Sequence, residues 1–176
     1  SALYHSYQMP NVFRDLNGEY LGFDREVHTA EGFVYYTDFS MWDTFRTQHP
    51  WLTLVAPERQ RDMVVSLLTM AEQGGFLPKW PQGGGYTSAM LGTPADIVIA
   101  DSYLKGITDF DVDFALAEML ETAAAATPAD SGYEGRGGVE SYNAHGYVAA
   151  DEHDGSVART LEFGHADFAI ANLAAA

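Results

Sequence analysis

The apolar positions divide the chain into an irregular first part and a helical remainder. Residues 1–36 carry no helical repeat of apolar positions, and we expect irregular or β-like structure there. Asn17-Gly18 is a common turn pair. The residues on its two sides, 9–16 and 20–27, are therefore predicted to pair as a short hairpin.

Two helices are predicted next. A short one covers residues 40–49 and ends before Pro50, because proline disfavours helical geometry in the residue before it. A longer one begins near Pro57, since proline suits the first helical position, and it ends at Gly74-Gly75. Its apolar residues recur at helical spacing: Met63, Val64, Leu67, Leu68 and Ala71.

Two more helices have recognisable ends. The first has Thr93 as its N-cap, Pro94 in its first turn and Gly106 after its last residue. The second is predicted over residues 111–126, with Asp109 as its cap.

Glycine-rich loops separate the remaining elements. Residues 76–85 and 132–138 form two such loops, followed by a helical turn over residues 139–145. Long loops rich in glycine and aromatic residues are more often functional than structural. A last helix starts near Ser156 and runs to Ala176 without a stop signal, so we expect an internal piece of a larger domain.

Composition narrows the function classes. Hydrophobic residues make up 47% and charged residues 19%, which is typical of a globular protein. The 25 acidic and 9 basic residues give a formal charge of −16, which disfavours binding to nucleic acids and to anionic membranes. Without cysteine there is no disulfide framework and no thiolate chemistry.

One segment carries a family resemblance. Ser40-Met41-Trp42-Asp43-Thr44-Phe45-Arg46 resembles the Ser-Leu-Trp-Asp-Thr-Tyr-Arg signature of family 92 glycoside hydrolases. Further similar blocks follow in order across nearly the whole chain, which makes the resemblance specific. They are residues 3–5, 15–20, 49–50, 57–59, 77–80, 90–92, 99–107, 138–142 and 146–148.

The resemblance implies a fold and an activity. The fold is mainly α: residues 1–176 would form part of an (α/α)6 toroid, with long loops and a short β-like hairpin at the N-terminus. The activity is inverting hydrolysis of terminal α-linked mannose with a bound calcium ion. The family's general acid and general base lie in motifs that this sequence lacks. We therefore assign no catalytic residue and no metal ligand here, expect the calcium ligands outside this chain, and expect this segment alone to be inactive.

The resemblance also indicates three substrate-binding residues. Trp42 and Asp43 match a pair that contacts mannose: an indole offers an apolar face, and a carboxylate accepts hydrogen bonds from hydroxyls. The alternative is a buried helical tryptophan beside a capping aspartate. Tyr86 stands where the family commonly has an acidic pattern, and it is predicted to alter the substrate preference. Its alternative is loop variation without consequence. We expect Trp42 and Asp43 to face a concave pocket near Trp80 and Tyr86.

Other acidic residues are weaker candidates. Asp96, Asp101 and Glu140 could in principle supply acid–base chemistry, but Asp96 is predicted in the first turn of a helix, where any acid is favoured. Residues 151–154 form an acidic cluster that lacks the order of a calcium loop, so a solvated loop is the better interpretation.

The expected partners follow from this assignment. They are a mannose-containing glycan and either the remaining part of the catalytic domain or an oligomer partner, in a secreted or periplasmic setting. Because half a toroid leaves apolar faces open, we expect a partner to cover Leu67, Leu68, Phe168 and Leu173. The alternative function is a non-catalytic helical module that binds carbohydrate or protein.

Overall fold

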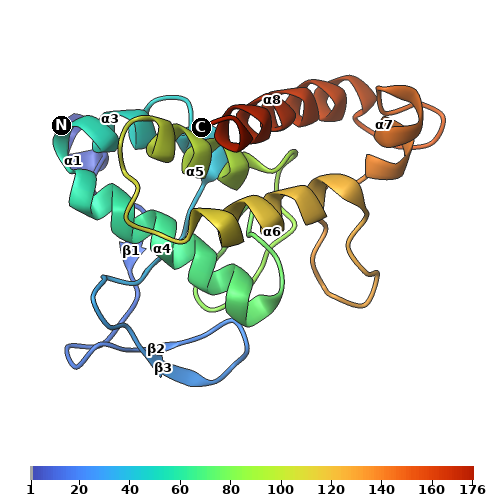
Figure 1. The fold of residues 1–176 in the computed structure, drawn as a ribbon. Coiled ribbons are helices and arrows are strands. Elements are labelled where there is room, and N and C mark those ends of the chain that lie inside the picture. The colour runs from blue at the N-terminus through green and yellow to red at the C-terminus, as the bar shows by residue number, and fades with distance from the viewer. Residues whose placement is uncertain (1) are drawn as a thin grey trace.

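A computed structural model describes residues 2–176. Helices make up nearly half of this part of the chain, and one of two small sheets lies below them in Figure 1. In chain order the elements are α1 (Ala2–His5), β1 (Asn11–Val12), β2 (Glu19–Leu21), β3 (Val27–Thr29), β4 (Tyr36–Thr37), α2 (Met41–Thr44), α3 (Gln48–Val55), α4 (Pro57–Gly74), α5 (Pro94–Leu104), α6 (Val112–Ala124), α7 (Val139–His145) and α8 (Ser156–Ala174).

The N-terminal strands pair differently from the predicted hairpin, which is wrong in its strand partners. Strand β1 pairs antiparallel with β4, and β2 pairs antiparallel with β3. Asn17-Gly18 does form a turn, because the Gly18 amide donates to the Asp15 carbonyl at 3.0 Å. Strand β2, which follows this turn, nevertheless pairs with β3, which comes later in the chain.

A contact with helix α4 and the stacking of buried rings account for these strand pairings. The Tyr36 amide donates to the hydroxyl of Ser66 at 3.0 Å, which attaches β4 to that helix. Tyr20 of β2 stacks on the fully buried Tyr35, with ring centroids 3.9 Å apart. Burial of these rings against the helices decides which strands meet, and a local turn signal does not report it.

The predicted helix over residues 40–49 is also wrong. Helix α2 ends at Thr44, and α3 begins at Gln48 and includes Pro50. Proline is tolerated there because the amides of the first helical turn have no intrahelical acceptor, so the missing N–H costs nothing.

The longer helices agree with the sequence patterns. Helix α4 ends where Gly75 takes a left-handed conformation with φ of 88°, and α5 has Pro94 in its first turn. Helix α6 is capped by Asp111, whose Oδ1 accepts from the Phe114 amide at 2.9 Å, and not by Asp109 as predicted. Asp109 instead lies at the surface, 3.3 Å from Arg61.

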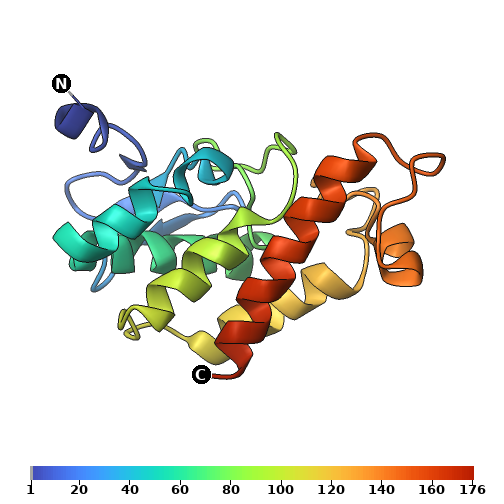
Figure 2. The ribbon, with the colours of Figure 1, turned by 90° about the horizontal axis from the view of Figure 1, so that it is seen from above.

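Helix α5 is at the centre of the packing. It is buried continuously from Pro94 to Ala100, and it contacts α3, α4 and α8. Figure 2 shows α5 and α8 side by side, with α6 along the other flank of α8. Among residues 2–176, no helix is both long enough and apolar enough to span a membrane.

This packing corrects the expected open faces. Leu67, Leu68 and Leu173 are only 0%, 6% and 4% exposed, so the chain itself buries them and no partner is required. The apolar face of α4 is covered by α3, α5 and α6, and α8 packs on α5 and α6. Phe168 is 67% exposed, and its covering by a partner stays a prediction.

Candidate functional site

Helix α2 holds the first two predicted site residues next to each other. It is a single turn that starts after Ser40, whose carbonyl accepts from the amides of Asp43 and Thr44. Asp43 is exposed, and Trp42 is half-buried. Neither side chain is fully buried, and their contact with a sugar stays a prediction.

The indole of Trp42 is fixed by a carboxylate from the far end of the chain. Its Nε1–H donates to Oε1 of Glu162 at 3.1 Å, and Glu162 lies on α8. The guanidinium of Arg46 stands 4.7 Å from the indole ring centroid and 3.5 Å from the same carboxylate oxygen. One edge and one face of the indole are therefore occupied by protein groups.

A glycine makes room for this contact. Gly92 has a φ of +72°, which a side chain rarely adopts, and a Cβ at this position would lie 2.9 Å from Cβ of Glu162. The loop before α5 therefore passes so close to α8 that only glycine fits without displacement. Sequence analysis identified Met90-Leu91-Gly92 as a similar block but gave no reason for the glycine.

Tyr86 has the contacts of a residue that anchors its loop. Its ring packs edge-on against Phe23 and tilted against Tyr133, each with centroids 4.7 Å apart. Its hydroxyl lies 2.6 Å from the Phe76 carbonyl and accepts from the Phe76 amide at 3.1 Å. Burial raises the pKa of this phenol. The predicted contact of Tyr86 with a sugar stays a prediction.

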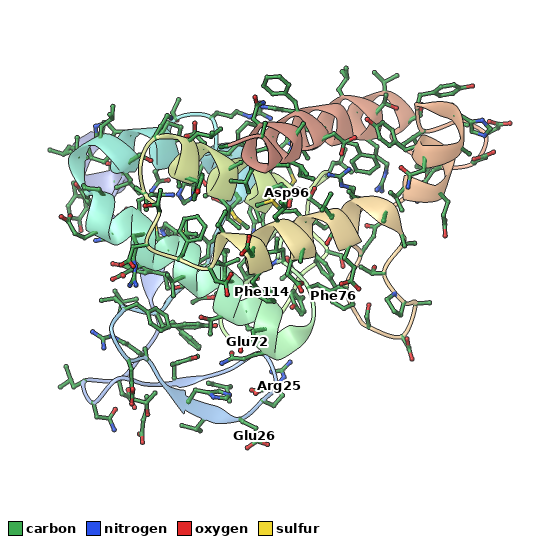
Figure 3. All side chains as sticks on the ribbon, in the orientation of Figure 1. Arg25, Glu26, Glu72, Phe76, Asp96 and Phe114 are labelled. Atoms are coloured by element: carbon green, nitrogen blue, oxygen red, sulfur yellow. The ribbon has the colours of Figure 1, made fainter. Side chains whose placement is uncertain are left out.

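Several hollows in the described part of the chain lie away from Trp42, Asp43, Trp80 and Tyr86. One of about 360 Å³ is lined by α4 and the start of α6, including Glu72 and Phe114, which Figure 3 labels. None of its lining residues belongs to α2 or to the loop of Trp80. The expected pocket formed by Trp42, Asp43, Trp80 and Tyr86 therefore stays a prediction.

Asp96, which Figure 3 labels, belongs to a buried network and not to an open site. Its Oδ2 accepts from Thr93 at 2.6 Å and from Arg136 at 3.3 Å, while its Oδ1 has no partner among the described residues. Burial raises the pKa of Asp96 to about 6, although Arg136 and Thr93 act in the opposite direction. Arg136 also bonds Asp167, at 2.5 Å. The network ties the loop of residues 132–138 to α5 and α8.

A second buried cation holds the same loop. Lys79 is almost fully buried, and its Nζ donates to the Gly135 carbonyl at 3.3 Å and lies 3.7 Å from Glu134. Glu134 is also 3.4 Å from Arg159 of α8. Burial lowers the pKa of Lys79. Lys79 belongs to the similar block of residues 77–80, but its burial was not predicted, because a buried lysine has no local signal in the sequence.

The other acidic candidates lie at the surface. Asp101 pairs with Lys105 one turn later, at 2.6 Å, and Glu140 is exposed on α7. Within residues 2–176, no three His, Asp or Glu side chains come together in a way that could hold a metal ion. The expectation that the calcium ligands lie outside this chain stays a prediction.

One known protein with a similar sequence is named as a glycosidase. A protein of Arthroderma benhamiae named as an uncharacterized secreted glycosidase is 34% identical over 120 residues, which is 62% of this chain and 15% of the relative.

Solved structures of similar fold are α-mannosidases. The α-mannosidase BT3965 of Bacteroides thetaiotaomicron is 35% identical, with a TM-score of 0.87 over 97% of this chain and 22% of its own. The inverting mannosidase BT2199 of Bacteroides thetaiotaomicron VPI-5482 is 34% identical, with a TM-score of 0.89 over 99% of this chain and 24% of its own. This chain thus spans about a quarter or less of these relatives.

These neighbours confirm the predicted fold class, a mainly α segment of an (α/α)6 toroid. The model of the glycosyl hydrolase family 92 catalytic domain matches residues 1–176, the full length of the sequence. With this match and with relatives at 34–35% identity that share its fold, the chain belongs to glycosyl hydrolase family 92.

Proposed function

We propose that this chain forms part of the mannose-binding pocket of an inverting α-mannosidase that removes terminal α-linked mannose from glycans. Membership of family 92 supports a glycosidase. Two similar structures are of mannosidases, one of them named as inverting, and BT3965 has also been solved with mannoimidazole. Because the chain spans 22–24% of those structures, the activity belongs to a domain of their length.

The pair Trp42 and Asp43 carries the proposal. The exposed carboxylate of Asp43 can accept hydrogen bonds from two neighbouring hydroxyls of one sugar. The indole beside it offers an apolar surface to the C–H face of the ring. Both side chains come from one short helical turn, so their relative position is fixed by the backbone. A terminal mannose bound there would be oriented for attack at its anomeric carbon.

The contribution of this chain is binding and orientation. Inverting hydrolysis needs an acid and a base about 6.5–9.5 Å apart, with a water between them. Asp96 is enclosed in a buried network, and Asp101 is paired at the surface, so we assign neither to this role. Residues elsewhere in the domain supply the acid, the base and the calcium ligands, and residues 1–176 alone are inactive.

The proposed location is outside the cytoplasm. The Arthroderma benhamiae relative is named as secreted, and terminal mannose on glycans is a substrate found on secreted and surface material. We therefore propose a secreted or periplasmic enzyme.

Binding of mannoimidazole tests the proposed site. The measurement is isothermal titration calorimetry on a catalytic domain of the length of the solved relatives. We expect Asp43→Asn to weaken binding by about tenfold or more, because a charged acceptor is lost while the shape is kept. Asp101→Asn is the matched control, since Asp101 is also a partly exposed helical carboxylate. Equal affinity of Asp43→Asn and wild type would refute the site.

Hydrolysis separates the two functions considered. Release of mannose from an aryl α-mannoside by the same domain, with inversion at the anomeric carbon, supports the mannosidase. Binding that depends on Asp43 without any hydrolysis would instead favour a non-catalytic carbohydrate-binding module. Turnover by the 176-residue chain alone, lost on Asp43→Ala, would contradict the assignment of the acid and base to other residues.

A further inference from the structure

Glu162 lies 120 residues after Trp42 in the sequence, and it belongs to none of the segments that resemble the family signature. Its side chain is 18% exposed, so the carboxylate is largely removed from water. A carboxylate in such a place needs partners, because burying an unpaired charge is costly. Within residues 2–176, the two side chains that bond Glu162 both belong to the signature segment of residues 40–46.

Trp42 and Arg46 share a single oxygen of this carboxylate. The indole Nε1–H donates to Oε1 at 3.1 Å, and the guanidinium of Arg46 is 3.5 Å from the same atom. Arg46 also lies over the rings of Trp42 and Phe45, at 4.7 and 4.5 Å from their centroids. A cation over an aromatic face is held there by the ring's quadrupole. Glu162 therefore neutralises the cation that covers Trp42 and holds the indole edge at once.

This arrangement leaves the face of the indole opposite Arg46 without a cation–π partner. The edge carrying Nε1 faces Glu162, and one flat face is covered by Arg46. An indole held at its edge cannot rotate about its side-chain bonds without breaking a hydrogen bond to a charged acceptor. A sugar that packs on Trp42 must therefore use the face opposite Arg46.

A third segment supports the position of Glu162. A Cβ at Gly92 would be 2.9 Å from Cβ of Glu162, so the loop before α5 packs directly against this side chain. The carboxylate is confined between this loop on one side and the signature segment on the other. The packing of α8 on α5 therefore helps to set the position of the Glu162 carboxylate.

We propose that Glu162 is a positioning residue for Trp42: it fixes the orientation of the indole so that the face opposite Arg46 is presented to the terminal mannose. Glu162 acts through Trp42 and Arg46 and need not touch the sugar. This inference rests on the proposed function, since it assumes that Trp42 contacts mannose.

The orientation of the indole can be followed without any sugar. The catalytic domain, at the length of the solved relatives, would be labelled with 5-fluorotryptophan, and the ¹⁹F signal of Trp42 assigned by its loss in Trp42→Phe. We expect Glu162→Ala to shift or broaden this signal, because the hydrogen bond and the cation over the ring are both released. Glu162→Gln keeps an acceptor for the indole N–H and should restore most of the wild-type signal. Glu31→Ala, at an exposed loop position, should change nothing.

Affinity for mannoimidazole completes the test. We expect Glu162→Ala to weaken binding about tenfold, and Glu162→Gln to weaken it by about threefold or less, with thermal unfolding used to confirm that each variant is folded. A Trp42 signal that does not respond to Glu162→Ala would overturn the inference. Equal weakening by Glu162→Gln and Glu162→Ala would also overturn it, since the amide retains the acceptor.

Trp42→Ala separates the inference from the proposed function. If Trp42→Ala binds mannoimidazole more weakly than wild type and Glu162→Ala does not, only the positioning role fails. If Trp42→Ala binds as tightly as wild type, the sugar contact itself is wrong, and the inference fails with it.

Discussion

The guanidinium of Arg136 lies 3.3 Å from Oδ2 of Asp96, and both side chains are almost completely buried. Arg136 comes from a loop and Asp96 from the first turn of α5, so the ion pair joins an irregular segment to the central helix. Arg136 has a second carboxylate partner in Asp167 of α8, which is 40% exposed. Buried pairs of this kind contribute little net stability but are costly to break, because one charge is left without its partner.

Replacing Asp96 by alanine should destabilise the chain by about 3 kcal/mol at pH 7, because Arg136 and Thr93 lose their shared acceptor. The buried charge of Arg136 would then be balanced only by the partly exposed Asp167. Urea unfolding followed by circular dichroism measures the change, and Asp101→Asn at the surface should alter stability by only about 0.5 kcal/mol. A loss no larger than that of the control would show that the pair is unimportant.

The same variant predicts a pH dependence. Burial raises the pKa of Asp96 to about 6, so the folded state takes up a proton at a higher pH than the unfolded state. This contribution to stability is fully present below about pH 4 and is lost as the pH rises through 6. The advantage of wild type over Asp96→Ala should therefore grow on acidification from pH 7 to 4, by on the order of 2–3 kcal/mol. An advantage that shrinks would contradict the raised pKa.

Burial of His49 should make stability depend on pH in the opposite sense to Asp96. Its Nδ1 lies 2.9 Å from Oε1 of Gln60, its Nε2 has no partner among the described residues, and burial lowers its pKa to about 4. The unfolded state binds a proton near pH 6.5 and the folded state does not, so stability is lost as the pH falls from 6.5 toward 4.

The loss should reach about 3 kcal/mol. It should be absent in His49→Gln and present in the exposed control His5→Gln. A direct check is the ring resonance of His49 in an NMR titration, which we expect to stay constant between pH 5.5 and 8. A titration midpoint near 6.5 would show that the ring is hydrated.

Gly92→Ala should destabilise the chain by about 2–3 kcal/mol, because it combines a strained φ of +72° with a Cβ too close to Glu162. Gly32→Ala is a matched control: its φ is +78°, but nothing lies within 4 Å of its Cβ, so about 1 kcal/mol of strain remains alone. Chemical unfolding of both variants gives the difference that the contact causes. Equal losses would mean that the loop moves away from α8 without cost.

Tyr86→Phe should lower stability by about 1–3 kcal/mol, because the carbonyl and amide of Phe76 both lose the hydroxyl as a partner. Tyr147→Phe, at an exposed position, is the control. Titration of the same variants with mannoimidazole tests the role predicted from sequence. A variant that keeps its stability but loses affinity for the ligand would identify Tyr86 as a sugar ligand.

The parts of the fold that sequence predicted are those with local causes. The ends of α4 and the start of α5 follow from Gly75, Pro57 and Pro94, whose backbone preferences act on their immediate neighbours. The pairing of β1 with β4 could not be predicted, since it depends on burial of Tyr36 beside Ser66, 30 residues away. Pro50 led to the wrong prediction of a helix end, because the effect of a proline depends on whether it follows a helix or lies inside the first turn of one.

The candidate site divides in the same way. Trp42 and Asp43 were identified from a contiguous segment, whereas Glu162 becomes relevant only when α8 packs beside that segment. The burial of Arg136 gave no signal in the sequence either, because arginine is usually exposed. Its burial depends on two carboxylates, Asp96 of α5 and Asp167 of α8. Long-range charge pairing is information that a single sequence does not contain.

Three buried cations, of which Arg136 lies in the loop of residues 132–138, also determine where trypsin can cut first. Trypsin cuts after lysine or arginine only when the surrounding backbone can enter its cleft, and Lys79, Arg136 and Arg159 are all held inside the fold. Arg25, by contrast, is exposed in the turn between β2 and β3, with a φ of 70°. Trypsin digestion of the folded chain should therefore start in the small sheets and spare the loop of residues 132–138. This loop has no regular structure, so by secondary structure alone it would be expected to be cut first.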